Sequence, residues 1–196
     1  DAEIEGILYM REEEKLARDV YLTMFDAWGL AVFENIAASE QTHTDSVKDM
    51  IEKYRLADPV VDDSVGVFVN QELATLYAQL IARGTQSALE ALHVGAYIEE
   101  VDMVDLARAS EATDNADIRQ LYENLMSGSR NHLRAYVGQI ENQGIVYEAQ
   151  YLSQEEVDAT VERLGFKQRQ QYVAGRSGIG RAFQGNDLAG AQMRQQ

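Results

Sequence analysis

The sequence predicts an all-α protein built around four long helices, and three observations support this. Apolar residues recur at alternating steps of three and four over long stretches, which is the spacing of a helix with one buried face. Pro59 is the only proline, so these stretches lack the residue that most often interrupts a helix. Apolar residues make up 45% of the 196 positions, enough for one domain with a full-sized core.

The first long helix is expected from about Glu3 to Ala27, and Gly29 ends it. The residues expected to face inward are Ile7, Met10, Glu14, Ala17, Tyr21, Met24 and Trp28. Glu14 is the only acid among them. Glu12 and Glu13 point away from this face, so we expect them to be solvated and to pair with Lys15 and Arg18.

The second long helix is expected from about Ala31 to Tyr54, ending before Asp58-Pro59. The residues expected to face inward are Phe33, Ile36, Glu40, His43, Val47, Met50 and Tyr54. Glu40 and His43 are three positions apart and therefore share one face of the helix. A carboxylate and an imidazole on an apolar face need partners, because buried charge is costly unless it is paired or binds a metal.

Residues 57–69 are expected to form a long crossover connection, followed by a short helix from about Asn70 to Ala82. The third long helix is expected from about Ser87 to Ala109. Its inward residues are Ala88, Leu92, Gly95, Glu99, Asp102, Leu106 and Ala109. Two acids, Glu99 and Asp102, therefore lie on this face. Glu100 is one position away and would replace Glu99 if the helix were rotated.

The fourth long helix is expected to open at Asp114 to Ala116 and to end near Asn142. Its inward residues are Ile118, Tyr122, Leu125, Ser129, His132, Tyr136 and Ile140. A further short helix is expected from about Ser153 to Arg163, beginning with a capping box. These patterns divide the chain into a bundle at 1–145, a short helical extension at 146–164 and a Gly/Gln/Arg-rich tail at 165–196.

The charge distribution excludes some functions. The net charge of −16 argues against a nucleic-acid binder, and no apolar run is long enough to span a bilayer. Residues 164–196 carry five Lys or Arg and one Asp, so an acidic body precedes a basic tail. That tail could dock on its own body, on a second subunit or on another acidic partner, and we expect a homo-oligomer, a dimer. We also expect a soluble protein, either cytoplasmic or exported after removal of a signal peptide.

The four inward faces together predict one polar layer inside the bundle. It would contain Glu14, Glu40, His43, Glu99, Asp102, Ser129 and His132. Because carboxylates outnumber imidazoles there, a bound cation would neutralise the layer better than shared protons. The alternative is a metal-free network in which the carboxylates bond to the two histidines and to buried tyrosines. The absence of cysteine excludes thiolate ligands and disulfides.

Over about residues 3–142 this pattern resembles the ferritin-like superfamily, most nearly the rubrerythrin type, and within it an uncharacterised prokaryotic branch. Such bundles hold two iron or manganese ions with one Glu from each of two helices and a Glu-x-x-His from each of the other two. The resemblance implies a metal set of Glu14, Glu40, His43, Glu99 and His132, with Asp102 as an extra acid. Ser129 departs from it, because a bridging glutamate is expected at that position.

The resemblance also implies a function. We expect an iron protein, dinuclear, with manganese or zinc as other metals, that acts as an oxidoreductase on dioxygen or peroxide, like a ferroxidase or peroxidase. Because serine is a poor ligand for such ions, a metal-binding or iron-handling bundle without turnover is a second hypothesis. A third is a structural or interaction bundle that uses its basic tail. The sequence assigns no catalytic residue beyond the ligands.

Overall fold

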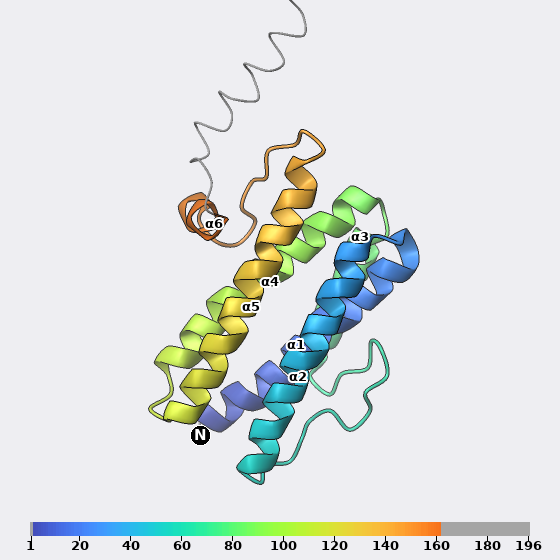
Figure 1. The fold of residues 1–196 in the computed structure, drawn as a ribbon. Coiled ribbons are helices and arrows are strands. Elements are labelled where there is room, and N and C mark those ends of the chain that lie inside the picture. Colours follow the sequence, from blue (N-terminus) through green and yellow to red (C-terminus); the bar gives the residue numbers. More distant parts are fainter. Residues whose placement is uncertain (1, 162–196) are drawn as a thin grey trace, which may run out of the picture.

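The computed structural model describes residues 2–161, and this part of the chain contains six α-helices and no strand (Figure 1). The helices are α1 (Ala2–Trp28), α2 (Ala31–Lys53), α3 (Gln71–Gly84), α4 (Ala88–Glu111), α5 (Ala116–Glu141) and α6 (Gln154–Thr160). The all-α prediction is confirmed, and every predicted helix is present, with those expected ends that fall among the described residues met within a few residues. The basic tail at 165–196 and the expected end of the last helix at Arg163 lie outside the described residues.

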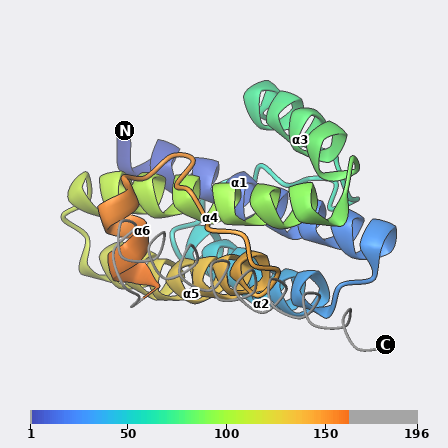
Figure 2. The same cartoon turned by 90° about the horizontal axis from the view of Figure 1, so that it is seen from above.

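The four long helices pack as a bundle of two pairs (Figures 1 and 2). Helix α1 lies along α2, and α4 lies along α5, with further contacts between α1 and α4 and between α2 and α5. Only Gly29 and Leu30 separate α1 from α2. Gly29 has a φ of 63°, which glycine adopts without steric cost, so the chain can reverse there.

The connection between the two pairs covers α1. Residues 54–70, which we call the crossover segment, lead from α2 to α3, and α3 then packs on α1 and α4 outside the bundle (Figure 2). Helix α1 is consequently surrounded by α2, α3, α4 and the crossover segment. No helix among residues 2–161 combines the length and apolar character that crossing a membrane would require.

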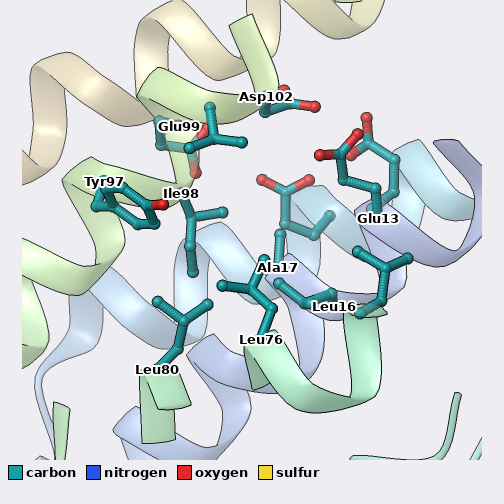
Figure 3. A pocket seen from close by; sticks show the side chains of 13 residues that line it. Glu13, Leu16, Ala17, Leu76, Leu80, Tyr97, Ile98, Glu99 and Asp102 are labelled. Carbon is teal, nitrogen blue, oxygen red and sulfur yellow. The ribbon is translucent and has the colours of Figure 1, made fainter. Parts of the chain in front are cut away.

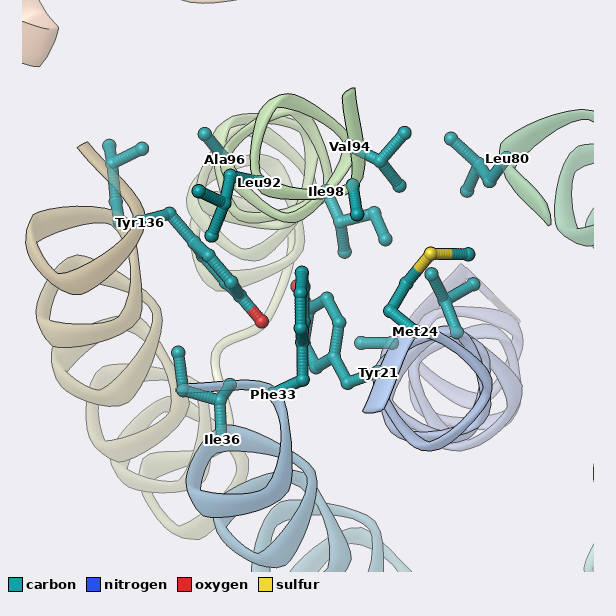
Figure 4. Packing of buried hydrophobic residues seen from close by; sticks show 14 of the residues in the cluster. Tyr21, Met24, Phe33, Ile36, Leu80, Leu92, Val94, Ala96, Ile98 and Tyr136 are labelled. Atoms are coloured by element: carbon teal, nitrogen blue, oxygen red, sulfur yellow. The ribbon is translucent and has the colours of Figure 1, made fainter. Parts of the chain in front are cut away.

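There are two apolar clusters, one toward each end of the bundle, and the predicted polar layer lies between them. The first contains Tyr21 and Met24 of α1, Phe33 of α2 and Tyr136 of α5 (Figure 4). The members of the second include Ile7, Met10, Val47, Ile51, Leu106 and Leu125. The prediction was wrong for the last residue expected to face inward on α2, because Tyr54 is 37% exposed beyond the last turn of that helix.

The charged residues on the outer face of α1 are buried, and for Glu12 this corrects the expectation of a solvated side chain. Lys15 and Asp19 are both fully buried and paired at 2.5 Å, and the Lys15 ammonium also donates to the Ser64 carbonyl at 2.9 Å. Arg18 binds Asp19 and Asp63, each at 2.8 Å. The crossover segment supplies these partners, and sequence periodicity cannot show that it folds back onto α1.

Glu12 belongs to the same outer network. Its carboxylate accepts hydrogen bonds from the backbone N–H groups of Val69 at 2.6 Å and Asn70 at 3.0 Å. Arg11 reaches the side chain of Asp58 at 3.2 Å and also donates to Thr44. The expected pairing of Glu12 with Lys15 or Arg18 is therefore wrong, since the crossover segment satisfies all three side chains.

Candidate metal centre

The structure brings the predicted site residues into one buried layer. Each of the four long helices contributes at least one: Glu14 from α1, Glu40 and His43 from α2, Glu99 and Asp102 from α4, and Ser129 and His132 from α5. Glu14, Glu40 and Glu99 are at most 2% exposed, and the His43 side chain is 12% exposed. The periodicity of each helix had placed these side chains on inward faces, and their convergence follows from the way the two helix pairs meet.

Glu40 lies at the centre of the layer. Its Oε2 is 2.8 Å from His43 Nδ1 and its Oε1 is 2.7 Å from His132 Nδ1, so one carboxylate contacts both imidazoles. Glu14 Oε2 lies 3.2 Å from His43 Nδ1, and Glu99 Oε2 lies 3.4 Å from His132 Nδ1. Two triads result, Glu14–Glu40–His43 and Glu40–Glu99–His132, each with ligand atoms within 4.8 Å of one another. They share Glu40.

Other side chains hold these groups in place. His132 Nε2 is hydrogen-bonded to Ser39 Oγ at 2.9 Å, and the Tyr21 hydroxyl donates to Glu99 Oε1 at 2.6 Å. The rings of His43 and His132 stack with centroids 5.4 Å apart. Such contacts orient an imidazole so that its other nitrogen points into the site. Here that nitrogen is Nδ1 for His132.

Gly128 on α5 lies directly against the His43 ring. A Cβ built on Gly128 would overlap the ring atoms Cε1 and Nε2. Only glycine therefore lets α5 approach α2 closely enough for His43 to take its observed position. The sequence analysis missed this residue because a helical glycine off the apolar stripe carries no local signal of what packs on it.

The electrostatics of the layer follow from burial and from the close imidazoles. Burial alone would raise the pKa of Glu40, but His132 and His43 beside it lower that pKa to about 2. Burial alone would lower the pKa of His43, but Glu14 and Glu40 raise it to about 11. The charges of Glu99 and Glu40 likewise outweigh burial and raise the pKa of His132 to about 10. In the metal-free protein the two imidazoles thus act as the cations of the layer.

The remaining carboxyl groups of the layer have too little positive charge near them to offset their burial. Burial, followed by the charge of Asp102, raises the pKa of Glu14 well above its usual range. Burial, followed by the charge of Glu99, raises the pKa of Asp102 to about 8. Glu14 Oε1 and Asp102 Oδ1 are buried without a hydrogen-bond partner. Buried oxygens without partners are rare and costly, and a cation would satisfy them.

The sequence analysis identified Asp102 as an extra acid and Ser129 as a departure from the expected glutamate, and these two side chains are in contact. The Ser129 hydroxyl donates to Asp102 Oδ2 and to the Leu125 carbonyl, the latter at 3.0 Å. Asp102 belongs to neither triad. Ser129 thus holds one oxygen of Asp102 and leaves the other free.

Glu100 is not an alternative to Glu99. Its carboxylate accepts the Tyr147 hydroxyl at 2.5 Å and the backbone N–H groups of Gln150, Tyr151 and Leu152 at 2.6–2.9 Å. These bonds fasten the segment between α5 and α6 to α4. The rotation of α4 assumed in the sequence analysis, which turns Glu99 inward, matches the structure.

A small cavity of about 20 Å³ adjoins the layer between α1, α3 and α4 (Figure 3). One wall carries the carboxylates of Glu13, Glu14, Glu40, Glu99 and Asp102, and the facing wall includes the α3 side chains Leu73, Leu76 and Leu80. A space of this size holds a water molecule or a comparably small species. Glu13, expected at the surface, is only 6% exposed and lines this cavity, which is a correction.

The chain is similar to known proteins over most of the described residues. Residues 3–163 match the family described as "Uncharacterized protein domain (DUF2202)". The chain is 52% identical over 161 residues to the uncharacterized protein MJ0754 of Methanocaldococcus jannaschii, covering 82% of this chain and 87% of that protein. The crystal structure of the hypothetical protein MJ0754 from Methanococcus jannaschii DSM 2661 superposes with a TM-score of 0.79, covering 82% of this chain and 92% of the other.

Proposed function

The chain belongs to the DUF2202 family, and from the geometry of its buried layer we propose that it is a ferritin-like metal-binding protein that holds two divalent ions. Iron is the metal we favour, with manganese or zinc as alternatives. The single observation behind this proposal is the pair of triads that share Glu40. One carboxylate with an imidazole at each oxygen is the arrangement expected of a bridging ligand between two ions.

The donor set fits such a pair. Glu14, Glu40 and His43 would hold one ion, and Glu40, Glu99 and His132 the other. Carboxylate oxygen together with imidazole nitrogen suits iron, manganese and zinc. Two hydrogen bonds support the proposal, because they would orient ligands of the ions. Ser39 holds the His132 ring and Tyr21 holds the Glu99 carboxylate. The departure at Ser129 leaves the pair with one carboxylate fewer than the resemblance implies.

We further propose that the protein is an oxidoreductase that acts on dioxygen or peroxide. A bound iron pair supplies electrons that these small molecules accept. The chain contributes a buried layer, an apolar wall from α3 that excludes bulk water, and a cavity of about 20 Å³ beside the carboxylates. That cavity favours a small substrate such as dioxygen or peroxide over a larger organic one.

Anaerobic loading with ferrous iron, followed by peroxide or dioxygen, tests this proposal. The wild-type protein should bind two equivalents and oxidise them faster than free iron does. His43→Ala and Glu40→Ala should abolish both effects, whereas Glu123→Gln, an exposed charge change on α5, should leave them intact. Failure of the wild type to bind iron, or oxidation no faster than in its absence, would reject the proposal.

A second candidate function is metal binding or iron handling without turnover, and Ser129 is the observation that favours it. Ser129 is buried beside Asp102, where a fourth-helix glutamate would complete the bridging set. Under this view Ser129→Glu should start oxidase activity or tighten iron binding in a protein that otherwise binds iron without oxidising it. If wild-type protein already oxidises bound iron, or if Ser129→Glu changes neither property, this second function is rejected.

A further inference from the structure

The cavity beside the acidic layer has two unlike walls (Figure 3). Five carboxylates form the inner wall, and three leucines of α3 lie on the facing wall. The volume of about 20 Å³ is enough for a water molecule or a molecule of similar size, and too small for an organic substrate. Burying an anion beside these acids would be costly, so the space is suited to small uncharged molecules.

Three of the side chains that line the cavity are only half-buried, and they mark where it approaches the surface. They are Leu76 of α3 and Tyr97 and Val101 of α4, whereas the other lining residues are buried. A side chain that contacts both a cavity and solvent is the barrier between the two. A molecule that passes this barrier meets the carboxylates of the layer directly.

Helix α3 is fastened to α1 at both ends. Near its start, the Glu12 carboxylate accepts the backbone N–H of Asn70 at 3.0 Å, and Asn70 caps the helix. At its end, Trp28 Nε1 donates to the Gly84 carbonyl at 2.9 Å. An opening between α3 and the bundle therefore depends on side chains rather than on movement of the whole helix.

Leu76 is the most mobile of the three barrier side chains. The Tyr97 ring lies edge-on to the ring of Tyr151, with centroids 6.2 Å apart, which restrains it. Val101 is branched at Cβ and therefore stiff at χ1. Leu76 is aliphatic and half-buried, so its side chain can rotate between staggered conformers and open the space beside it.

We propose that small uncharged molecules such as dioxygen reach the acidic layer through this cavity, and that Leu76 is the side chain that admits them. The purpose of the route rests on the proposed function, because the molecules would react at the ions held by the two triads. Admission itself requires no ion, since protein side chains alone line the cavity. Leu76 is thus a residue that determines which molecules enter.

Methyl NMR of the full, metal-free chain under dissolved dioxygen tests the cavity. Dioxygen is paramagnetic and speeds the relaxation of methyl groups close to it. The methyl groups of Leu73 and Leu80, which line the cavity, should be affected more than those of Leu133 on α5, which is similarly buried elsewhere in the bundle. An equal effect on the cavity and control methyl groups would overturn the route.

Substitution of Leu76 tests the entrance. Leu76→Trp should block it, so the effect of dioxygen on the Leu80 methyl groups should fall to that seen at Leu133. Leu76→Ala should increase the effect at Leu80. Leu22→Trp is the matched control and should change nothing, because Leu22 is 39% exposed on α1 and is not a lining residue.

Two results would overturn the assignment of Leu76. One is an effect at Leu80 that Leu76→Trp leaves unchanged, and the other is an equal loss in Leu76→Trp and Leu22→Trp. If Leu76→Trp does not fold, as judged by its helical circular dichroism, Leu76→Ala decides alone, and no increase in that variant would overturn the assignment.

Iron loading separates this inference from the proposed function. With ferrous iron bound anaerobically, Leu76→Trp should slow oxidation by dioxygen while binding as many ions as the wild type. A wild type that binds no iron but admits dioxygen to the cavity would overturn the proposed function and leave the route standing. A wild type that binds and oxidises iron without any dioxygen effect at Leu73 or Leu80 would overturn the route alone.

Discussion

The two faces of α1 both bury charge, but they satisfy it differently. On the outer face, Lys15, Arg18 and Asp19 meet the crossover segment, and on the inner face, Glu13 and Glu14 meet α2 and α4. Asp19 accepts from Lys15, from Arg18 and from the backbone N–H of Gly66 at 2.9 Å. The protein itself therefore supplies both the positive charges and the hydrogen bonds that the Asp19 carboxylate requires.

The acids of the inner face lack a complete set of such partners. Glu13 and Glu14 each keep a buried oxygen without a partner, and their nearest charged neighbours include the acids Asp102 and Asp105. A complete network of buried charges can hold segments together, whereas an incomplete one is what the proposed metal ions would complete. On the proposed function, these two clusters of similar burial on one helix have different roles, because their partners differ.

Breaking the outer network should have the largest effect on folding. Asp19→Ala would leave Lys15 buried without its carboxylate, and removal of one partner of a buried ion pair costs about 3–5 kcal/mol. Urea denaturation in the presence of a chelator measures this loss. The exposed control Asp49→Ala on α2 should change stability by less than about 0.5 kcal/mol. A loss below about 1 kcal/mol for Asp19→Ala would contradict a structural role for the outer face.

Displacing His43 should weaken the inner site without unfolding the bundle. Gly128→Ala places a methyl group against the His43 ring, so metal affinity should fall about 10- to 100-fold, as when the surroundings of other ligands are altered. Equilibrium binding of Mn²⁺ measures it. Gly6→Ala on α1 is the matched control, because its Cβ would lie 3.4 Å from the Tyr122 hydroxyl, an ordinary contact. Equal affinities for the two variants would show that the His43 position is unimportant.

Metal affinity of the inner site should rise with pH. In the metal-free protein the pKa of His43 is raised to about 11 and that of His132 to about 10. Both imidazoles are therefore in the positively charged form at neutral pH. A metal requires neutral imidazole, and binding therefore releases protons. Affinity should increase about tenfold per pH unit for each proton released between pH 6.5 and 8.5. Calorimetry in two buffers of different ionisation enthalpy counts those protons, and a count of zero would argue against histidine ligation.

Neutralising one acid of the inner face should have the smallest effect on metal-free stability. Burial raises the pKa of Glu14 well above its usual range, and Gln keeps the size and shape of the side chain while removing its charge. Glu14→Gln should change the free energy of unfolding by less than about 1 kcal/mol. The same variant should lose most of the rise in Tm that Mn²⁺ gives the wild type. A large destabilisation in chelator would instead show that the inner face is structural, like the outer one.

Much of the candidate site could be predicted because helix periodicity is local. Steps of three and four placed Glu14, Glu40, His43, Glu99 and His132 on inward faces, and the structure places all five in one layer. The rotation of α4 was also correct, since Glu100 turns to the segment after α5 instead.

The remaining features depend on contacts between distant segments. Glu12 and Glu13 were expected in solvent because they are off the inward face of α1, with Lys15 as a pairing partner. They are buried because the crossover segment and α3, some 50 residues later, pack over that helix. The close approach of Gly128 to His43 is likewise invisible in either helix alone.

The sequence by itself determined which stretches are helical and which side of each helix turns inward, because hydrophobic spacing and capping act over a few residues. Only the tertiary structure decided which buried charges are satisfied by the chain and which are left without partners. That distinction depends on which donors and acceptors of other helices come within hydrogen-bond distance, and spacing along one helix carries no information about them.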